Sequence, residues 1–563
     1  MRSLPFTKIK CLTTLATNLL ALSTLCLPLT AQAQTPADAG QLLQQIEKER
    51  ATALPKKTAP VISPAPQAMQ PVTGVMVTVK SFRFAGNTLL GNDELAPVVA
   101  EYLNRPLSFT ELQKAAAAVA EAYRAAGWVV RAYLPQQDIQ NGIVTIQIVE
   151  AVFGGVKIEG SPAKRVALAQ IQNGFEAQQK KGAPLNSNAL DRALLLADNL
   201  PGVAVSGSLQ EGVNASETDL MLKLADEPII VGEASLDNTG SRSTGSGRLT
   251  ANLNLNSPFG YGDLVSSNLI HTQGSDYLRL AVTIPVGADG WRMGANASAL
   301  SYRLIAPEFA ALNGKGTSST VGLDANYPII RSRLKNLYLG MSYDNKQFDN
   351  QSSGATQSHY QINTFTTNLN GNLFDNFGGG GANSASLALI SGRVALGALD
   401  AGETAALGGR FSKLRYSLSR QQVITDSVSF YAALSGQDAN NKNLGSSEKF
   451  YLGGSGGVRA YPTSEGGGSS GNLLNLELRG RLPKGFVLTG FYDHGGIRNY
   501  DGSKSYSLKG AGATLAWQAE FGLSLKATWA QRIGNNPNST VTGNDQDGSL
   551  HKNRYWLTVS MPF

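Results

Sequence analysis

Cysteine is nearly absent from this chain of 563 residues: only Cys11 and Cys26 carry a thiol, and both lie among the first 33 residues. Those residues have the features of a secretory signal, so a mature chain beginning at Gln34 would contain no cysteine. This absence excludes a disulfide framework and a thiolate metal site. Histidine is scarce too, with four residues and no pair at a spacing that suits a metal ligand. No metal and no cofactor are therefore expected.

Residues 1–33 are predicted to be a signal peptide. They begin with basic residues, continue with an apolar run at 19–29 that is too short to span a bilayer, and end in the small-x-small site 31–33. Lipid attachment at Cys26 is disfavoured because the preceding Leu25 is too bulky for the usual signal. The segment holds three basic residues and no acidic one, so its removal lowers the net charge from +7 to +4. So small a surplus does not favour nucleic acid binding.

Long apolar runs are also missing. No stretch after residue 33 reaches 18 consecutive apolar residues, so no transmembrane helix is predicted. Only 16% of residues are charged and 61 are glycine, a composition that argues against a disordered chain and against a coiled coil. An exported chain of this kind is either a soluble β protein or an outer-membrane barrel.

The mature chain is expected to begin with one amphipathic helix. Within the segment 34–54, residues 40–53 place Leu42, Leu43 and Ile46 on one side. The stretch 55–74 that follows is rich in proline and reads as an extended linker. A lone amphipathic helix cannot bury its apolar face by itself. We therefore expect this helix to dock elsewhere in the molecule or to remain mobile.

Residues 75–228 contain an internal repeat with a period of about 76 residues. Each copy, 75–150 and 151–228, reads strand, helix, helix, strand, strand, which suffices for two helices on a three-stranded sheet. In the first copy, Ser108-Phe-Thr-Glu111 predicts a capping box at the start of a helix. Such small sheets leave their edges unpaired, and an exposed edge is a place where another strand can add.

From residue 229 to 563 the apolar pattern changes to a period of two, in segments of about ten residues separated by turns. We count sixteen such segments: 229–239, 246–256, 262–272, 275–285, 291–303, 318–328, 335–344, 360–371, 384–393, 411–420, 427–436, 472–481, 486–494, 509–518, 520–530 and 553–563. An even number puts both ends of a closed sheet on one side, and the preceding repeats make that side the periplasm.

The connections between these segments alternate in length. Those after odd segments are often long, such as 304–317, 345–359 and 437–471, whereas those after even segments are mostly short. A soluble sandwich has no reason for this asymmetry, which is typical of an outer-membrane barrel. The predicted fold class is therefore α+β periplasmic repeats, as two βααββ domains, followed by a transmembrane antiparallel β-barrel of 16 strands.

The last segment alternates apolar residues up to a C-terminal aromatic, from Tyr555 to Phe563. An exposed apolar edge of this kind invites aggregation unless it pairs with another strand. We therefore expect it to pair with the first strand and close the barrel, with Tyr555 and Phe563 as its C-terminal signature.

The longest connection, 437–471, carries the motif Val458-Arg459-Ala460-Tyr461-Pro462, and Phe491-Tyr492-Asp493 ends the segment after next. A solvated surface arginine is the simpler interpretation of Arg459. If the loop folds back into the pore, however, Arg459 and Asp493 can form a charge-assisted pair.

No enzyme is predicted, because the catalytic motifs lack their context. Two G-x-S-x-G matches, 453–457 and 467–471, are not followed by the helix that a nucleophile elbow requires. The chain also contains no phosphate-binding loop.

Taken together, these features resemble the two-partner secretion transporters, which export haemolysins and filamentous adhesins. The resemblance covers the helix, the linker, the repeats and the barrel, and stretches such as 85–88, 127–128 and 236–240 look typical of the family. It implies that the repeats are polypeptide-transport-associated domains.

The resemblance also implies a role for the loop motif. In this family a Val-Arg-Gly-Tyr loop tip, here Val458, Arg459 and Tyr461, bonds through its arginine to a Phe-x-Asp motif on the barrel wall, here Phe491 and Asp493. The chain departs from the pattern at Ala460, where glycine is usual. Alanine there would cost about 1 kcal/mol if the position needs a positive φ.

The function that the resemblance implies is export across the outer membrane without ATP, with the N-terminal domains in the periplasm and the first helix as a plug. The expected partners are a large secreted exoprotein (an adhesin, a cytolysin or a haem-binding protein), outer-membrane lipid and the barrel assembly machinery, with no nucleic acid. One alternative is an outer-membrane assembly factor, which usually carries three or more repeats. Another is a passive porin, which would leave residues 75–226 unexplained.

Overall fold

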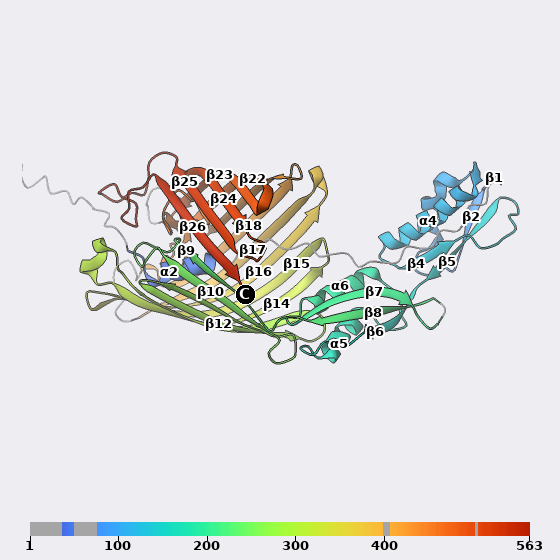
Figure 1. Ribbon diagram of the computed structural model, residues 1–563, viewed down its shortest axis with the longest axis horizontal. Helices are drawn as coiled ribbons and strands as arrows, with labels where there is room; N and C mark the ends of the chain where they lie inside the picture. Colours follow the sequence, from blue (N-terminus) through green and yellow to red (C-terminus); the bar gives the residue numbers. More distant parts are fainter. Residues whose placement is uncertain (1–35, 50–75, 215, 398–405, 501–504) are drawn as a thin grey trace, which may run out of the picture.

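The computed structural model describes residues 36–49, 76–214, 216–397, 406–500 and 505–563. The predicted signal peptide, 1–33, and the predicted linker, 55–74, lie outside the described residues. Figure 1 shows a β-barrel with one helix inside it and two small α/β domains extending from one end. None of the described helices is both long enough and apolar enough to cross a bilayer.

The first α/β domain has eight short elements: β1 (Met76–Thr78), β2 (Ser81–Ala85), α3 (Asn92–Leu95), the 3-10 helix η1 (Pro97–Tyr102), β3 (Pro106–Ser108), α4 (Phe109–Ala125), β4 (Val130–Tyr133) and β5 (Ile143–Glu150). Its sheet has the order β2-β5-β4, and β2 runs parallel to β5. At the start of α4 the Ser108 amide donates to Glu111 over 2.8 Å, forming the capping box. This hydrogen bond is the main reason that the pKa of Glu111 falls to about 2.

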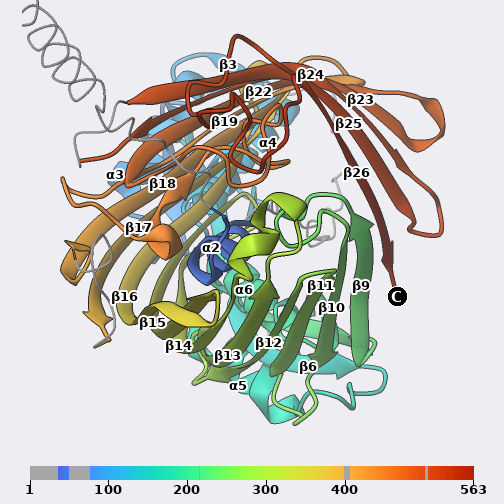
Figure 2. The same ribbon diagram turned by 90° about the vertical axis from the view of Figure 1, so that its left-hand side faces the viewer.

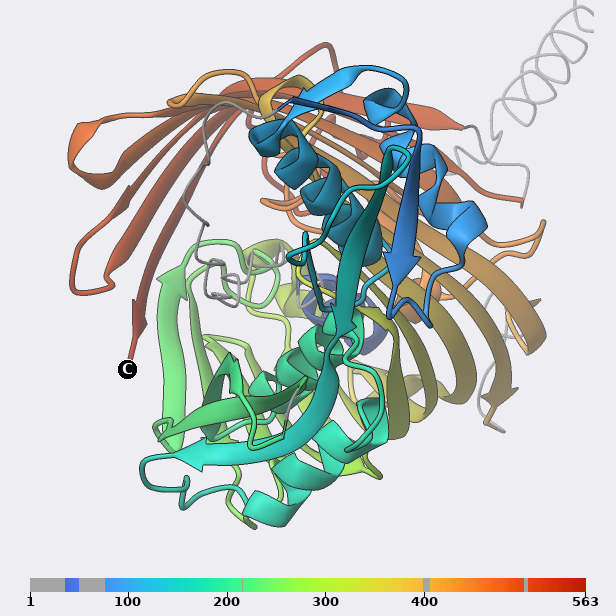
Figure 3. The same cartoon turned by 90° about the vertical axis from the view of Figure 1, so that its right-hand side faces the viewer.

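The second α/β domain repeats the pattern with β6 (Val152–Glu159), α5 (Leu168–Gln178), α6 (Ser187–Asp198), β7 (Val203–Glu211) and β8 (Glu217–Asp226). Its strand order is β6-β8-β7, so β6 and β7 are edge strands. Phe153, Phe175 and Leu220 form part of its buried core. Figure 3 shows both domains in front of the periplasmic mouth of the barrel.

The second domain docks on the short periplasmic turns of the barrel. Asp289, in the turn between two strands, accepts hydrogen bonds from Gln178 over 2.8 Å and from Tyr327 over 2.6 Å. A leucine of α6, Leu196, packs so closely on Gly290 that a Cβ there would lie 2.8 Å from it. The absence of a side chain at Gly290 therefore permits the close approach of helix and turn.

The sixteen-stranded barrel is confirmed, and each of the sixteen predicted segments overlaps one strand. The strands are β9 (Ile230–Asp237), β10 (Arg248–Asn256), β11 (Leu264–Thr272), β12 (Ser275–Val286), β13 (Trp291–Arg303), β14 (Lys315–Arg331), β15 (Lys335–Ser352), β16 (Ala355–Asp375), β17 (Gly381–Leu396), β18 (Gly409–Val423), β19 (Val428–Asp438), β22 (Ser470–Arg481), β23 (Phe486–Arg498), β24 (Tyr506–Gln518), β25 (Ser524–Arg532) and β26 (Asn553–Pro562). All are antiparallel to their neighbours, and β26 pairs with β9 to close the sheet.

One predicted long loop, 345–359, is wrong. Strands β15 and β16 continue through most of it, and only Ser353 and Gly354 turn the chain, both with positive φ. A strand needs only about 9–11 residues to cross a bilayer. Beyond that length no apolar outer face is required, so the sequence pattern does not report the rest of these strands.

The closing seam ends at the C-terminus. Gly232 and Phe563 exchange two backbone hydrogen bonds, each of 2.9 Å, beyond the last paired residues of β9 and β26. A Cβ at Gly232 would lie 2.4 Å from the Phe563 ring, which therefore fits only against glycine. Tyr555 and Phe563 are 64% and 63% exposed on the outer face.

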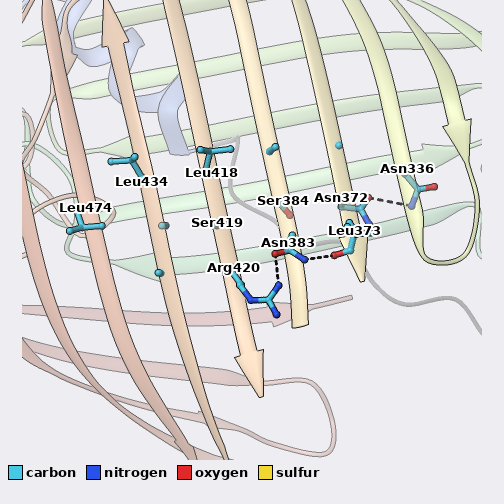
Figure 4. A pocket seen from close by; sticks show the side chains of 14 residues that line it. Asn336, Asn372, Leu373, Asn383, Ser384, Leu418, Ser419, Arg420, Leu434 and Leu474 are labelled. Atoms are coloured by element: carbon cyan, nitrogen blue, oxygen red, sulfur yellow. Dashed lines mark hydrogen bonds between the residues drawn. The ribbon is translucent and has the colours of Figure 1, made fainter. Parts of the chain in front are cut away.

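The barrel wall has a hollow of about 560 Å³ over β15 to β19 and β22. Figure 4 shows Leu418 and Leu434 beside it, with Arg420 bonded to Asn383 over 2.7 Å. Leu418 is 52% exposed, on the face opposite to the lumen. This hollow therefore belongs to the outer surface of the barrel and not to the site inside it.

Candidate functional site: the occluded lumen

Helix α2 (Ala39–Glu49) lies inside the barrel, as Figure 2 shows. The predicted helix spanned 40–53, of which residues 50–53 lie outside the described residues. Leu42, Leu43 and Ile46 are buried in a cluster with aromatic side chains of the barrel wall, among them Tyr302 and Phe348. The apolar face that a lone helix cannot bury is thus covered by the lumen wall.

Polar contacts fasten α2 to two strands of the wall, β10 and β15. The Nζ atom of Lys346 on β15 lies 3.0 Å from both carboxylate oxygens of Glu47. Arg248 on β10 pairs with Glu49 over 2.5 Å. At the other end of the helix, the Ala39 amide donates to Asn350 over 3.0 Å. These contacts are all non-covalent, so the helix can leave the lumen without the breaking of a covalent bond.

The connection between β19 and β22, residues 439–469, folds back into the barrel; we call it the lumen loop. It contains the 3-10 helix η4 (Ser446–Glu448) and the short strands β20 (Phe450–Tyr451) and β21 (Gly467–Gly468). Lys48 of α2 donates to the Tyr451 carbonyl over 2.9 Å. A Cβ at Gly40 would lie 2.7 Å from Ser446 Oγ. The plug helix therefore packs on the lumen loop as well as on the wall.

Arg459 at the tip of the lumen loop is held by Asp493 on β23. Its Nε and Nη2 atoms lie 2.9 and 2.6 Å from the two carboxylate oxygens of Asp493, and its backbone amide donates to the same group over 3.0 Å. Arg459 is 7% exposed and Asp493 is fully buried. This is a bidentate charge-assisted pair, the strongest class of side-chain hydrogen bond.

Other wall residues complete the environment of the guanidinium. Glu477 on β22 accepts from Nη1 of Arg459 over 2.8 Å. The Phe491 ring lies beneath the guanidinium, with its centroid 3.5 Å away, a cation–π contact. On β26, the Trp556 indole donates to the Arg459 carbonyl over 2.8 Å. The loop tip is thereby connected to three strands of the wall.

The motif residues beside Arg459 are buried in the same place. Val458, Ala460 and Tyr461 have no solvent exposure and form one apolar cluster with Phe491. The Arg532 guanidinium lies over the Tyr461 ring at 4.4 Å. Val458, Arg459, Tyr461, Phe491 and Asp493 therefore come together, whereas Tyr555 and Phe563 lie apart on the closing strand.

Ala460 fits the tip without a positive φ, so the cost of left-handed backbone does not arise. Its space comes from a glycine on the wall instead. A Cβ at Gly510 on β24 would lie 2.6 Å from the Ala460 Cβ atom. The methyl group at the loop tip is thus accommodated by the missing side chain opposite.

Sequence reasoning missed Glu477, Trp556 and the charged pair Lys413–Glu448. Glu477 carried a usable signal, because it is a carboxylate between outward-facing Leu476 and Leu478 in a barrel strand. The pairing of Glu448 in the loop with Lys413 on β18 joins positions that no sequence spacing connects. Over the described ranges, no group of three or more histidine and acidic residues is arranged to hold a metal.

These features define a class: an outer-membrane export barrel whose pore is filled by a helix and a folded-in loop. Residues 216–517 match the profile of the haemolysin secretion/activation proteins ShlB/FhaC/HecB, and residues 77–151 match the ShlB-type POTRA domain. The first match covers more than half of the chain. The chain therefore belongs to the ShlB/FhaC/HecB family of two-partner secretion transporters, and it is an outer-membrane protein with its POTRA region in the periplasm. This is a family of transporters, not of enzymes.

Individual relatives agree with this assignment. The chain is 25% identical to the heme/hemopexin transporter protein HuxB of Haemophilus influenzae (strain 86-028NP), over 93% of this chain and 95% of that one. It is also 25% identical to the outer membrane transporter CdiB of Escherichia coli, over 78% and 74%. The solved structure of CdiB from Escherichia coli superimposes with a TM-score of 0.71 at 21% identity, over 93% of this chain and 98% of that one, and this confirms the fold.

Proposed function

We propose that this protein exports a large secreted partner, which arrives unfolded in the periplasm, passes through the barrel and folds outside the cell. The single observation that carries the mechanism is the occupation of the lumen by a helix and a loop that non-covalent contacts hold in place. A passive porin has no use for such an obstruction. Folding of the partner on the outside supplies the drive, since the chain contains no phosphate-binding loop.

The partner is proposed to bind first to the periplasmic domains by strand addition. Strands β6 and β7 are edges of the second sheet, and β2 and β4 are edges of the first. An edge strand offers unpaired backbone groups, which an extended chain can match without a fixed sequence. This mode suits a partner that reaches the transporter before it has folded.

Helix α2 is proposed to act as a plug that leaves when the partner arrives. Deleting residues 34–54 should then raise the open probability of single channels in planar bilayers. Leu43→Ala should give a smaller rise, because it removes one buried side chain at about 2–5 kcal/mol and leaves the rest of the helix in place. If the deletion variant shows the same single-channel conductance and open probability as the parent, the plug proposal is wrong.

The pair Arg459–Asp493 is proposed to hold the lumen loop in the position that secretion needs. Arg459→Ala should abolish secretion of the partner, while the heat-modifiable mobility of the folded barrel stays normal. Arg498→Ala is the matched control, because Arg498 pairs with Asp438 on the exposed rim. Normal secretion by the Arg459 variant would show that the pair is dispensable.

The partner itself is proposed to be a large exoprotein of the haem-binding, adhesin or cytolysin type. One relative is named for heme and hemopexin, which makes the haem-binding type worth testing first. Co-expression with a large β-rich exoprotein encoded beside this gene should place that exoprotein in the medium. Its retention in the periplasm would rule out that partner.

Tyr555 and Phe563 are proposed to contact lipid and to present the last strand to the barrel assembly machinery. Both rings are more than half exposed on the outer face of β26. Aromatic side chains at this level of a barrel wall are common contacts with the membrane interface.

A further inference from the structure

A buried row of alternating charges connects the plug helix to the lumen loop. Lys346 on β15 lies between Glu47 of α2, at 3.0 Å, and Glu448 of η4, at 4.0 Å. Glu448 in turn contacts Lys413 on β18. Lys346, Glu448 and Lys413 are all less than a tenth exposed. One cation is therefore shared by the two elements that fill the pore.

The two carboxylates are unequally satisfied. Glu47 receives hydrogen bonds from Lys346 on both of its oxygens. Among the described residues, Oε1 of Glu448 is buried and has no hydrogen-bond partner, although its other oxygen contacts Lys413. A buried charged oxygen without a hydrogen bond is costly. Lys346 Nζ lies 4.0 Å from that oxygen, which is too far for a hydrogen bond.

We infer that Lys346 is a positioning residue that exchanges Glu47 for Glu448 when the plug helix leaves. A lysine side chain is flexible and carries three donors, so it can turn toward the second carboxylate once the first has gone. The exchange supplies the missing hydrogen bond of Glu448. Departure of the plug thus strengthens the attachment of the lumen loop to the wall.

This exchange allows the plug helix to leave without releasing the lumen loop from the wall. The plug packs on η4, so its loss removes contacts from the lumen loop. A new ion pair at Lys346 offsets part of that loss and keeps the loop against β15 and β18. The pore then opens on the side that α2 occupied, while the loop remains in place. The inference rests on the proposed role of α2 as a plug.

The test is a mutant cycle on the full-length chain in nanodiscs. Glu47→Gln removes the charge that holds Lys346 to the plug, and Lys346→Met or Glu448→Gln removes a partner of the new pair. Hydrogen exchange of residues 439–452 reports the opening of the lumen loop. Glu448→Gln is compared in both backgrounds, because it leaves the ion pair of Glu47 with Lys346 intact, so the loss of plug packing in Glu47→Gln cancels.

In the wild-type background Glu448→Gln should remove only the contact with Lys413, because Lys346 is bonded to Glu47 and lies 4.0 Å from Glu448. In the Glu47→Gln background Glu448→Gln should accelerate exchange about tenfold more, as expected for the additional loss of a charge-assisted hydrogen bond from Lys346. Lys346→Arg should restore slow exchange, since arginine keeps the charge. Heat-modifiable mobility checks that each variant forms a barrel.

The outcomes separate the two proposals. If Glu47→Gln leaves single channels closed and fails to release the helix, the plug proposal is at fault. If channels open but Glu448→Gln accelerates exchange equally in both backgrounds, Lys346 does not change partners and the inference is wrong. A larger effect of Glu448→Gln in the Glu47→Gln background, absent when Lys346→Met is also present, supports it.

Discussion

Substituting asparagine for Asp493 tests how firmly the lumen loop is seated. Asparagine keeps the size of the side chain but removes its charge. Arg459 would keep at most one of its two side-chain hydrogen bonds to this position, of 2.9 and 2.6 Å, because the amide has one acceptor oxygen, and Glu477 would be its remaining carboxylate partner. Leaving one member of a buried ion pair without its partner costs about 3–5 kcal/mol. At the lower figure, the population of the displaced loop should rise about 100-fold.

The displaced loop can be counted by chemical labelling. The chain has no cysteine after residue 26, so Ser455→Cys places a single thiol near the loop tip. A membrane-impermeant maleimide added to intact cells should label it much faster in Asp493→Asn than in the parent. Asp438→Asn is the matched control, because Asp438 pairs with Arg498 at the exposed rim, where such pairs contribute little.

A second variant distinguishes the loss of the Arg459–Asp493 attraction from the cost of leaving the Arg459 charge buried without its partner. Arg459→Gln combined with Asp493→Asn leaves no unpaired charge from this pair, so labelling should be slower than in Asp493→Asn alone. If Asp493→Asn labels no faster than the Asp438→Asn control, the pair does not hold the loop and the reasoning from burial fails.

Three further perturbations follow from the same structure. Gly510→Val should displace the loop tip and speed labelling of the same thiol, because even a Cβ would lie 2.6 Å from Ala460; labelling at the parent rate would mean that the wall yields. Glu465 of the lumen loop is buried against the loop between β25 and β26. Its carboxylate accepts hydrogen bonds from Asn536 and Asn538 and faces Asp545. Burial raises the pKa of Glu465 to about 7. A raised folded-state pKa favours the protonated form, so this contact is fully stable below about pH 4.5 and weakens as the pH rises through 7; hydrogen exchange of residues 536–546, corrected for its intrinsic pH dependence, should increase between pH 6 and 8 in the parent and not in Glu465→Gln. Deleting Phe563 removes two backbone hydrogen bonds at the seam and should lower the melting temperature of the barrel by a few degrees, as expected for about 1–2 kcal/mol; an unchanged transition would show that closure does not depend on the terminal residue.

Much of the architecture was predictable from the sequence because its causes are local. Alternation along a strand follows from the two environments of a barrel wall, so each of the sixteen segments could be found without its partners. Residues 109–125 form a helix that begins at a capping box, which four adjacent residues specify. The predicted loop at 345–359 was wrong because the rule weakens where a strand leaves the membrane.

The candidate site divides in the same way. The residues alone allowed Arg459 and Asp493 to pair if the loop folds back into the pore, and the resemblance to a family strengthened that expectation, since a spacing of 34 residues says nothing about contact. The structure decided that Glu477 and Phe491 share the guanidinium, and that Gly510 makes room for Ala460.

The sequence by itself determined that this chain is exported, forms a sixteen-stranded barrel and carries two periplasmic repeats, because composition and period record the environment of each residue. Only the tertiary structure decided that a helix and a loop fill the pore, and which charged residues pair there. The row from Glu47 through Lys346 and Glu448 to Lys413 joins a helix, two strands and a loop. Such a row depends on how distant segments meet inside the closed wall, and no local pattern contains that information.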